Sequence, residues 1–396
     1  MAHRPPRSGE PQIAQFPSDF VLLQVTPRLE AGGAEQASID IAGLVARAGA
    51  TALIASAGGA LEGALARAGG RLLRGPYNAK DPVRIALNAR RLESIIRTEA
   101  VSLVHVHSRA PAFSALRAAR RTHVPLLTTY HGAYPASWWA KRRYNRIMTA
   151  GAAVIAPSHF IAGEITRQHP RAKDRIVVIP EGIDLDRFDP DQVSQERVAQ
   201  ARARMGITDA DSPVLLLAGR LAASKGQSLS LAALARLPAA AGRPILVLAG
   251  AGEARRLARL TAVVARLGLS DQVRFTGAID DMPAAWIAAD LALAPSIVPE
   301  AFGRTAAEAA AMGRPVLATA CGALAETMAD GETGWLAESP DPDAFAAALA
   351  KALVAGGPEW ARIGAAARRR AAHLYSLGAM ADALFALYGR LVETRR

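Results

Sequence analysis

Short apolar runs alternate with longer amphipathic stretches along almost the whole chain. Each run has the length of a strand. Several are nearly continuous in apolar residues, which is typical of strands buried on both faces of a parallel sheet. Amphipathic stretches such as 34–48 and 83–97 predict the intervening helices. The strands are predicted at 20–25, 51–55, 103–106, 126–130, 154–156, 176–179, 214–218, 245–249, 273–276, 291–294 and 315–319.

The alternation of strand and helix implies βαβ units with right-handed crossovers, and therefore an α/β fold with parallel sheets. The pattern breaks at Asp189-Pro190-Asp191, and a polar helix predicted over 194–205 leads into the second series. We therefore expect one domain over 18–193 and a second over 194–375. Residues 376–396 are expected to contain a C-terminal amphipathic helix, and residues 1–17 to form a disordered basic tail.

Composition narrows the class of protein. Of the 396 residues, 51% are apolar and only 5% are aromatic, which suits helices packed around aliphatic strands. The single cysteine, Cys321, excludes an internal disulfide and a cysteine-based zinc site, and it fits a reducing compartment. No apolar run reaches the roughly 18 residues that a membrane-spanning helix needs, and the first residues lack the apolar segment of a secretory signal.

The net charge of +12 is unevenly distributed. Residues 1–198 contain 26 Lys and Arg against 17 Asp and Glu, and the remaining residues contain 21 against 18. The N-terminal half is therefore expected to favour polyanions, such as an anionic lipid, a phosphorylated saccharide or a nucleic acid. An arginine-rich composition inherited from a GC-rich genome is the alternative explanation.

A glycine pair, Gly32-Gly33, follows the first predicted strand and opens a helix. Glycines let a ligand approach the backbone closely, and a helix N-terminus offers unpaired N–H groups to an anion. We therefore predict a phosphate or sugar contact here, with a plain glycine turn as the alternative. The segment is not G-x-G-x-x-G, which disfavours dinucleotide binding.

Two basic residues, Arg220 and Lys225, lie in the loop that follows the strand predicted at 214–218. Ligands of open α/β sheets bind at the carboxyl ends of the strands, where this loop begins. A forked guanidinium together with an ammonium group suits a diphosphate. The alternative is that both side chains are simply solvated.

The most specific motif runs from Ser296 to Glu308, between a predicted strand and a predicted helix. Glu300 lies in the loop, and Glu308 lies about one turn into the helix. A carboxylate accepts two hydroxyl hydrogen bonds at once, which suits the vicinal diols of a ribose or a hexose. An acidic residue near a helix start also interacts favourably with the helix dipole, and this alternative is sufficient for Glu308. It does not explain the Pro-Glu-x-Phe-Gly loop.

The spacing of Glu300 and Glu308 resembles the E-x7-E element of the retaining glycosyltransferases of family 4, the glycosyl transferases group 1, which have the GT-B fold. The resemblance covers roughly residues 20–390 and departs from the family at Ala323, where a second glycine is common. It extends to Gly32-Gly33-Ala34-Glu35, Thr129-Tyr130-His131-Gly132, Pro157-Ser158, Pro180-x-Gly182-Ile183-Asp184, Ala311-Met312-Gly313-Arg314-Pro315-Val316, Gly322-x-x-x-Glu326 and Gly331-x-x-Gly334.

The resemblance implies two Rossmann-like domains that face each other across a cleft, with the C-terminal helix returning to the N-terminal, acceptor-binding domain. The C-terminal domain would bind the donor. It also implies catalytic roles for His131, near the reacting carbon, and for Glu300, Arg220 and Lys225. The donor site would comprise Gly32, Gly33, Arg220, Lys225, Gly277, Ile279, Glu300, Ala301, Phe302, Gly303, Arg304, Thr305 and Glu308.

The mechanism follows from the charges that develop. Anomeric transfer passes through an oxocarbenium-like state, and cations near the departing diphosphate stabilise the transition state more than the ground state. The resemblance implies front-side attack, in which Glu300 orients the sugar. No cofactor and no metal are expected, because the D-x-D pattern Asp184-Leu185-Asp186 fits a turn or a cap better than a metal site.

Basic residues mixed with tryptophan follow the strand predicted at 126–130, and they resemble an interfacial membrane patch or a clamp for a phosphorylated acceptor. A helix that buries its aromatic residues is the alternative. We predict a cytoplasmic enzyme at the inner face of the plasma membrane that extends a glycolipid, such as a lipopolysaccharide core. The residues assigned to the acceptor or the membrane are Arg109, Arg117, Trp138, Trp139, Lys141, Arg142 and Arg143.

Several other functions are compatible with parts of the sequence. A soluble enzyme of the same fold, such as a sucrose or glycogen synthase, or a nucleotide-sugar 2-epimerase, would share the donor motifs. A catalytically inactive homologue is disfavoured because both Glu300 and Glu308 are present. The isoelectric point near 10.6 suggests a nucleic-acid-binding protein, but no nucleic-acid-reading module is apparent, and nucleic acid is not expected as a partner.

Overall fold

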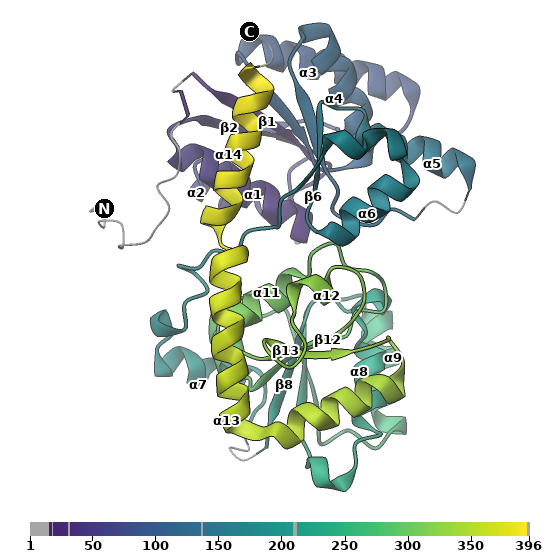
Figure 1. Cartoon of the computed structure of the whole chain (residues 1–396), viewed down its shortest axis with the longest axis vertical. Helices are drawn as coiled ribbons and strands as arrows, with labels where there is room; N and C mark the ends of the chain where they lie inside the picture. Colours follow the sequence, from purple (N-terminus) through teal and green to yellow (C-terminus); the bar gives the residue numbers. More distant parts are fainter. Residues whose placement is uncertain (1–15, 18, 31, 136–137, 209–211, 394–396) are drawn as a thin grey trace. The chain divides into compact units, whose positions relative to one another are not determined.

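The computed structural model describes residues 16–17, 19–30, 32–135, 138–208 and 212–393. The chain forms two compact units, which we call the first unit (1–182 with 377–396) and the second unit (183–376). Each is a parallel sheet covered by helices (Figure 1). The prediction of two Rossmann-like α/β domains is confirmed. Apart from Phe16 and Pro17, the expected basic tail lies outside the described residues.

The sheet of the first unit is parallel throughout, in the order β3-β2-β1-β4-β5-β6-β7. Its central strands are fully buried, because aliphatic side chains on both faces are covered by helices. Within the described residues its strands are β1 (Val21–Val25), β2 (Thr51–Ser56), β3 (Arg71–Arg74), β4 (Leu103–Val106), β5 (Leu126–Thr129), β6 (Ala153–Ala156) and β7 (Ile176–Val178).

Helices from both ends of the chain cover this sheet. The C-terminal helix α14 contributes Met380, Leu384 and Tyr388 to the same core as β1 and α1. The helices are α1 (Gly33–Arg47), α2 (Glu62–Arg67), α3 (Pro82–Thr98), α4 (Arg109–Thr122), α5 (Trp139–Asn145), α6 (His159–Gln168) and α14 (Leu377–Glu393), with 3₁₀ turns at Arg146–Thr149 and Pro170–Arg175.

The second unit has a parallel sheet in the order β10-β9-β8-β11-β12-β13. The strand order reverses between β8 and β11, and this point of an open α/β sheet forms the ligand crevice. The described strands are β8 (Val214–Ala218), β9 (Ile245–Ala249), β10 (Val273–Gly277), β11 (Leu291–Ala294), β12 (Val316–Thr319) and β13 (Gly334–Ala337).

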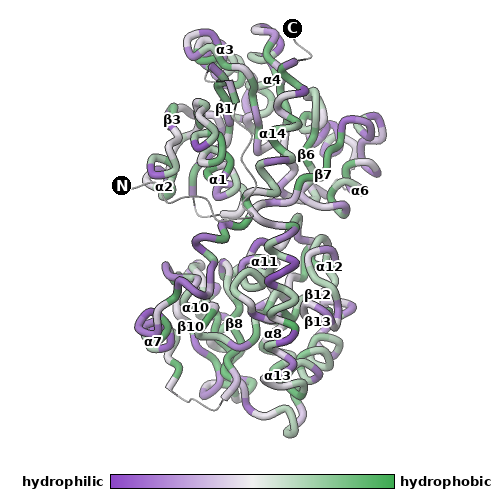
Figure 2. The backbone as a smooth tube through the Cα atoms, turned by 60° about the vertical axis from the view of Figure 1, so that its left-hand side comes forward, coloured by the Kyte–Doolittle hydropathy of each residue, from purple (hydrophilic) through white to green (hydrophobic). Residues whose placement is uncertain are grey.

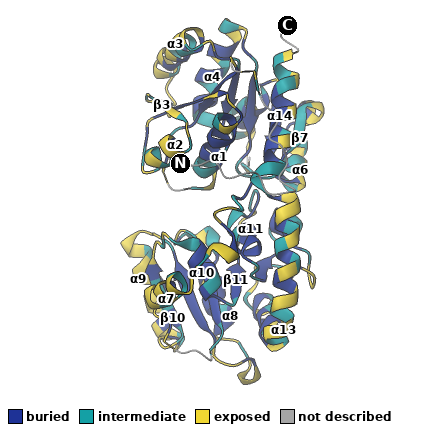
Figure 3. Cartoon of the chain, turned by 90° about the vertical axis from the view of Figure 1, so that its left-hand side faces the viewer, coloured by how far each residue is buried: buried dark blue, intermediate teal, exposed yellow. Residues whose placement is uncertain are grey.

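The helices of the second unit pack on both faces of this sheet. In Figure 3 the strand β11 is buried, whereas the outer faces of α9 and α13 are exposed. The longest helix, α13, is interrupted at Gly356, where φ is 73°, two residues before Pro358. The helices are α7 (Gln195–Arg204), α8 (Gln227–Leu234), α9 (Ala254–Arg266), α10 (Met282–Ala288), α11 (Arg304–Ala311), α12 (Leu324–Thr327) and α13 (Pro342–Leu374), with 3₁₀ turns at Pro190–Gln192, Ala223–Lys225 and Ala239–Ala241.

The observed boundary between the units differs from the expected one. It lies between Gly182 and Ile183, whereas the break in the sequence pattern suggested 193 and 194. The intervening residues belong to the second unit because Phe188 is buried in its core and the Ile183 N–H donates to the Tyr375 carbonyl at 2.6 Å. The polar break therefore marks a surface turn of the second unit.

Two strands were absent from the sequence prediction. The edge strand β3 is short and half exposed, with an arginine at each end, so it lacks the apolar run of a buried strand. The strand β13 begins with Gly334, whose backbone lies against Val316, and it contains only three other residues. Figure 2, coloured by residue hydropathy, shows the contrasting case of β8, whose apolar run predicted it.

Candidate active site

The loops after β8 and β11 meet at the point where the strand order reverses. Gly226, which precedes α8, has a left-handed backbone with φ of 70°, and a Cβ atom added there would lie 1.7 Å from the Pro295 carbonyl oxygen. The β8 loop thus approaches the β11 loop more closely than any residue with a side chain would allow. This contact fixes the position of Lys225, the residue immediately before.

Lys225 and Glu300 form the centre of the site. The Lys225 Nζ lies 2.6 Å from the Glu300 Oε1, and the Ser296 hydroxyl donates to the same oxygen at 2.5 Å. The lysine side chain is 30% exposed and the glutamate side chain 22%, so solvent still reaches both groups. The Ser296 carbonyl accepts a hydrogen bond from the Thr319 hydroxyl at 2.7 Å, which ties the loop to the end of β12.

The backbone of Glu300 is held from the other side. A bridge pairs Glu300 with Gly322, where φ is 71° and a Cβ atom would lie 2.6 Å from the Glu300 carbonyl oxygen. The Ala323 N–H donates to that carbonyl at 3.0 Å. Burial, and then the Glu300 charge, raise the pKa of the neighbouring Cys321 thiol. Cys321 itself is half buried.

The second carboxylate lies on α11. This helix begins after Gly303, whose φ of 94° gives its start a sharp turn, and the Phe302 ring before it is buried against Tyr375. The Arg304 Nε lies 3.1 Å from the Glu308 Oε1, and the two side chains are 15% and 14% exposed. The positive end of the α11 dipole therefore lies beside the carboxylates.

The remaining residues assigned to the donor site lie around this centre. Arg220 is exposed, and its backbone carbonyl accepts a hydrogen bond at 2.8 Å from the buried Gln227 at the start of α8. Ala301 and Thr305 are half buried on either side of Phe302 and Gly303. Gly277, the last residue of β10, is exposed, whereas Ile279 beyond it packs partly against the core.

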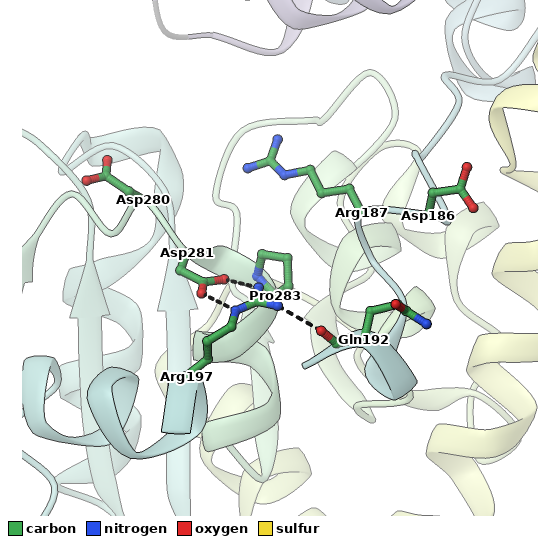
Figure 4. Close-up of a pocket in the computed structure, with 7 residues that line it drawn as sticks. All are labelled: Asp186, Arg187, Gln192, Arg197, Asp280, Asp281 and Pro283. Atoms are coloured by element: carbon green, nitrogen blue, oxygen red, sulfur yellow. Dashed lines mark hydrogen bonds and ion pairs between the residues drawn. The ribbon is translucent and has the colours of Figure 1, made fainter. Parts of the chain in front are cut away.

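The turn after β10 also borders an open hollow of about 450 Å³ in the second unit. Figure 4 shows the ion pair on its wall, in which the Arg197 guanidinium meets both Asp281 oxygens at 2.8 Å, while Arg187 and Asp280 extend away from that pair. Asp281 also caps α10, and Arg197 holds the pKa of its carboxyl below the usual value. The paired groups give this wall a structural role.

The D-x-D segment forms a turn. The Asp184 carboxylate accepts hydrogen bonds from the backbone N–H groups of Asp186 and Arg187, both at 3.1 Å. Such a side-chain-to-backbone turn is a common use of aspartate. Its geometry matches the turn expected from the sequence.

In the first unit, Gly32 is the residue before α1, with extended backbone, and Gly33 is exposed with open space around its Cα. His131, after β5, has both ring nitrogens engaged. Its Nε2 lies 3.0 Å from the His107 Nδ1, and its Nδ1 lies 3.3 Å from the Glu181 Oε1. The structure thus places His131 in a hydrogen-bonded chain within the first unit.

Sequence reasoning missed the partners of His131. Gln24 on β1 and His107 after β4 are buried, and their side chains lie 2.8 Å apart. Burial holds the pKa of His107 well below 6.5. A polar residue inside a predicted buried strand was the available signal, because buried polar groups are almost always hydrogen-bonded.

The segment with basic and aromatic residues is exposed. Trp138 is 59% exposed and Trp139 76%, so the alternative of a helix that buries its tryptophans is wrong. Arg109 is held at the end of this segment, because its guanidinium stacks on the Tyr134 ring at 4.1 Å and donates to the side chain of Asn145, the last residue of α5. Arg117, Arg142 and Arg143 are exposed, Lys141 is half buried, and Ser137 lies outside the described residues.

Two family models match the chain in sequence. The model described as Glycosyl transferases group 1 matches residues 203–370, and the model described as Glycosyltransferase Family 4 matches residues 31–187. The chain belongs to this family of glycosyltransferases. Together the two matches extend over parts of both units and include all the residues assigned to the donor site.

Curated relatives carry a more specific name. A D-inositol 3-phosphate glycosyltransferase of Streptomyces scabiei is 36% identical over 243 residues, covering 59% of this chain and 52% of that protein. The chain therefore matches about half the length of that relative. A protein of the same name from Xylanimonas cellulosilytica is 32% identical over 309 residues, covering 74% of this chain and 73% of the relative.

Solved structures share the GT-B architecture. A glycosyltransferase from Rickettsia africae ESF-5 superposes with a TM-score of 0.85 at 29% identity, covering 94% of this glycosyltransferase and 99% of that chain. The Anabaena protein Alr3699/HepE, solved with UDP and glucose, superposes with a TM-score of 0.82 at 22% identity, covering 94% and 100%. None of the helices in the described part of this chain combines the length and apolar character needed to cross a bilayer.

Proposed function

We propose that this glycosyltransferase moves a hexose from a nucleotide diphosphate sugar to an acceptor hydroxyl, with retention of the anomeric configuration. The observation that carries the proposal is the cluster of Lys225, Glu300 and Ser296 beside the N-terminus of α11. A cation, a carboxylate and the positive end of a helix dipole at one strand switch point are complementary to a diphosphate joined to a hydroxyl-rich sugar.

The same cluster explains the chemistry that the proposal requires. Bond cleavage at the anomeric carbon leaves negative charge on the diphosphate, and Lys225, Arg220 and the α11 dipole would stabilise it. Glu300 would orient the sugar through its hydroxyls, because its carboxylate is held in place by Lys225 and Ser296. Glu308 would accept the ribose hydroxyls. The acceptor's proton would pass to the departing phosphate.

A thermal-shift screen against UDP-, GDP-, ADP- and dTDP-sugars tests the donor site. A ligand at 100 times its dissociation constant stabilises the folded state by about 2.7 kcal/mol, so a bound donor gives a clear rise in Tm. We test UDP-glucose first, because the HepE structure was solved with UDP and glucose. If no sugar nucleotide raises the Tm, or if Glu308→Gln leaves the rise unchanged, the donor site is wrongly assigned.

The acceptor is proposed to carry phosphate. Residues 100–163 contain eight Lys and Arg and no Asp or Glu, so this stretch of the first unit attracts anions. Both the inositol 3-phosphate in the relatives' name and a lipid-linked saccharide such as lipopolysaccharide core share this chemistry. Arg142 and Arg143, exposed on α5, are the residues proposed to meet the phosphate.

A transfer assay with labelled donor separates these acceptors. D-inositol 3-phosphate and inositol are offered in parallel, followed by a phosphorylated lipid-linked saccharide and its dephosphorylated form. Preference for each phosphorylated member supports the proposal, and equal use of both members contradicts it. Return of an isomerised sugar nucleotide without acceptor would instead identify a 2-epimerase.

We also propose contact with the anionic inner face of the plasma membrane. Trp138 and Trp139 are exposed side by side, with ring centroids 6.2 Å apart, and they precede the basic residues of α5. Exposed tryptophans beside cations are typical of a surface that inserts shallowly between lipid headgroups. Co-sedimentation with vesicles tests this contact independently of any acceptor.

A further inference from the structure

A chain of hydrogen bonds in the first unit fixes the positions of the protons on three side chains. It runs from the Ser38 carbonyl through Gln24, His107 and His131 to Glu181, across α1, β1 and the ends of β4 and β5. Carbonyl and carboxylate oxygens stand at its two ends. A backbone carbonyl and an ionised carboxylate can only accept hydrogen bonds. They therefore decide which nitrogens along the chain must donate.

The orientation of the Gln24 amide determines that the His107 Nε2 carries a hydrogen. Its Nε2 donates to the Ser38 carbonyl at 2.9 Å, because the reverse orientation would place two carbonyl oxygens in contact. The Gln24 Oε1 therefore faces the His107 Nε2 at 2.8 Å and can only accept, so the His107 Nε2 carries a hydrogen. This assignment follows from the acceptor at Ser38 and not from the ring itself.

The tautomer of His107 determines which nitrogen of His131 carries a hydrogen. Burial is the main cause that holds the pKa of His107 well below 6.5, so its ring is neutral and its Nδ1 bears a lone pair. That lone pair lies 3.0 Å from the His131 Nε2, which must therefore donate. The His131 Nδ1 then faces the Glu181 Oε1 at 3.3 Å, in a site where the two side chains are only 8% and 10% exposed.

One further proton must lie between His131 and Glu181. Without it, a nitrogen lone pair would face a carboxylate oxygen in a buried site, which costs free energy. A hydrogen on the His131 Nδ1 gives a ring that donates to the carboxylate, so that both groups make a charge-assisted hydrogen bond. The proton therefore belongs on the His131 Nδ1.

We propose that Gln24, acting through His107, fixes His131 as a doubly protonated imidazolium paired with Glu181, and so places a positive charge at the carboxyl edge of the first sheet. Gln24 and His107 are positioning residues, since neither needs to touch a substrate. The value of this charge for an anionic substrate rests on the proposed function, but the protonation pattern does not.

Other titratable groups around the chain do not supply the charge. His105, whose ring centroid is 4.2 Å from that of His107, has its pKa lowered by burial to about 3. Its ring nitrogens contact the hydroxyls of Tyr388 and Thr129, which can each donate or accept and so impose no tautomer. Burial raises the pKa of Tyr388 and of Tyr134, so both phenols stay neutral.

The test is the ¹⁵N spectrum of the histidine rings in the full chain, labelled at histidine and recorded at pH 7.5 without ligand. Long-range ¹H–¹⁵N correlations distinguish doubly protonated rings from each neutral tautomer, and loss of one signal set in His131→Gln assigns that ring. We expect two protonated nitrogens on His131, and one protonated Nε2 on His107. A neutral His131 in the unaltered protein overturns the proposal without need of any variant.

Gln24→Leu tests the origin of the constraint. Without the Gln24 acceptor, His107 can carry its hydrogen on Nδ1 and donate to the His131 Nε2, so that neutral His131 donates from Nδ1 to Glu181. We expect the number of doubly protonated rings to fall by one. The matched control is Tyr388→Phe, which removes a partner of the neighbouring buried His105 and should leave His131 doubly protonated. An unchanged His131 in Gln24→Leu, or its loss in Tyr388→Phe, refutes the role of Gln24.

The histidine spectrum and the donor-binding screen can fail independently of each other. The spectrum is recorded without donor or acceptor, so a failed thermal-shift screen does not alter it. Conversely, a neutral His131 would leave the donor site on the second unit untouched.

Discussion

Replacing Gly226 with alanine is expected to destabilise the second unit far more than the same change at Gly268. The two glycines have nearly identical left-handed backbones, with φ of 70° and 69°. They differ in their surroundings: a Cβ atom at 226 would lie 1.7 Å from the Pro295 carbonyl oxygen, whereas one at 268 meets nothing within 4 Å. Comparison of the two variants therefore separates steric conflict from backbone strain.

The magnitude follows from these distances. An alanine in left-handed backbone costs about 1–2 kcal/mol at either position. At 226 the Cβ must also move from 1.7 Å to at least 3.0 Å from an oxygen of the backbone, which no side-chain rotation can relieve. Overpacking of this kind adds about 1–3 kcal/mol. For a unit of this size, an extra 2 kcal/mol lowers the Tm by about 4–8 °C.

Tryptophan fluorescence during urea or thermal unfolding provides the measurement. Trp286 and Trp335 are buried in the second unit, whereas Trp138 and Trp139 of the first unit are exposed, so the change in fluorescence reports mainly on the second. Equal losses of stability in Gly226→Ala and Gly268→Ala would refute the argument that the two loops touch. A smaller donor-induced Tm rise in Gly226→Ala alone is expected too, since the contact positions Lys225.

Three further predictions concern the site, the surface and pH. Lys225→Met should weaken donor affinity about 10- to 150-fold, which corresponds to the loss of one charge-assisted contact of about 1.5–3 kcal/mol. The control Lys351→Met, on the exposed face of α13, should leave the affinity unchanged, and both affinities are measured by calorimetric titration. Replacing Trp138 and Trp139 with serine should reduce co-sedimentation with anionic vesicles, and Val354→Ser, exposed in the second unit, should leave it unchanged. Lowering the pH from 7.5 to 5.5 should lower the unfolding free energy of the first unit by about 1–2 kcal/mol. The unfolded chain takes up protons at His105 and His107 below about pH 6.5 and the folded unit does not, while the proton that folded His131 already holds offsets part of this loss. The second unit, whose sequence contains only the exposed His373, is the internal control, and an equal loss there would contradict this origin.

The parts of the fold that sequence predicted best are those fixed by local pattern. Buried parallel strands are recognised by continuous apolar runs, and β8, β9 and β11 have them. The positions of Glu300, Gly303 and Glu308 between a strand and the first turns of a helix were also predicted, because the apolar run before them and the helical pattern after them are both local. The edge strand β3 and the short β13 lacked such a pattern.

The parts that sequence could not predict depend on register between distant strands. Gln24 on β1 pairs in register with His105 on β4. His107 lies two residues further along the chain, on the same side as His105, and this register brings its ring to the Gln24 side chain. No spacing within either strand reports it. Likewise, the contact of Gly226 with Pro295 depends on the pairing of β8 with β11, and the ion pair of Lys225 with Glu300 follows from that contact.

The pairing of Lys225 with Glu300 resolves an electrostatic difficulty in the proposed site. A carboxylate that holds the sugar must lie near a diphosphate that gains charge during the reaction, and two anions at such distances repel. With its Nζ 2.6 Å from the Glu300 Oε1, Lys225 offsets that repulsion before any donor binds. Removing the lysine therefore has two consequences, a lost cation for the diphosphate and an uncompensated carboxylate beside it. For this reason the double variant Lys225→Met with Glu300→Gln is expected to bind the donor nucleotide diphosphate more tightly than Lys225→Met alone, whereas independent roles would make the double variant the weaker binder.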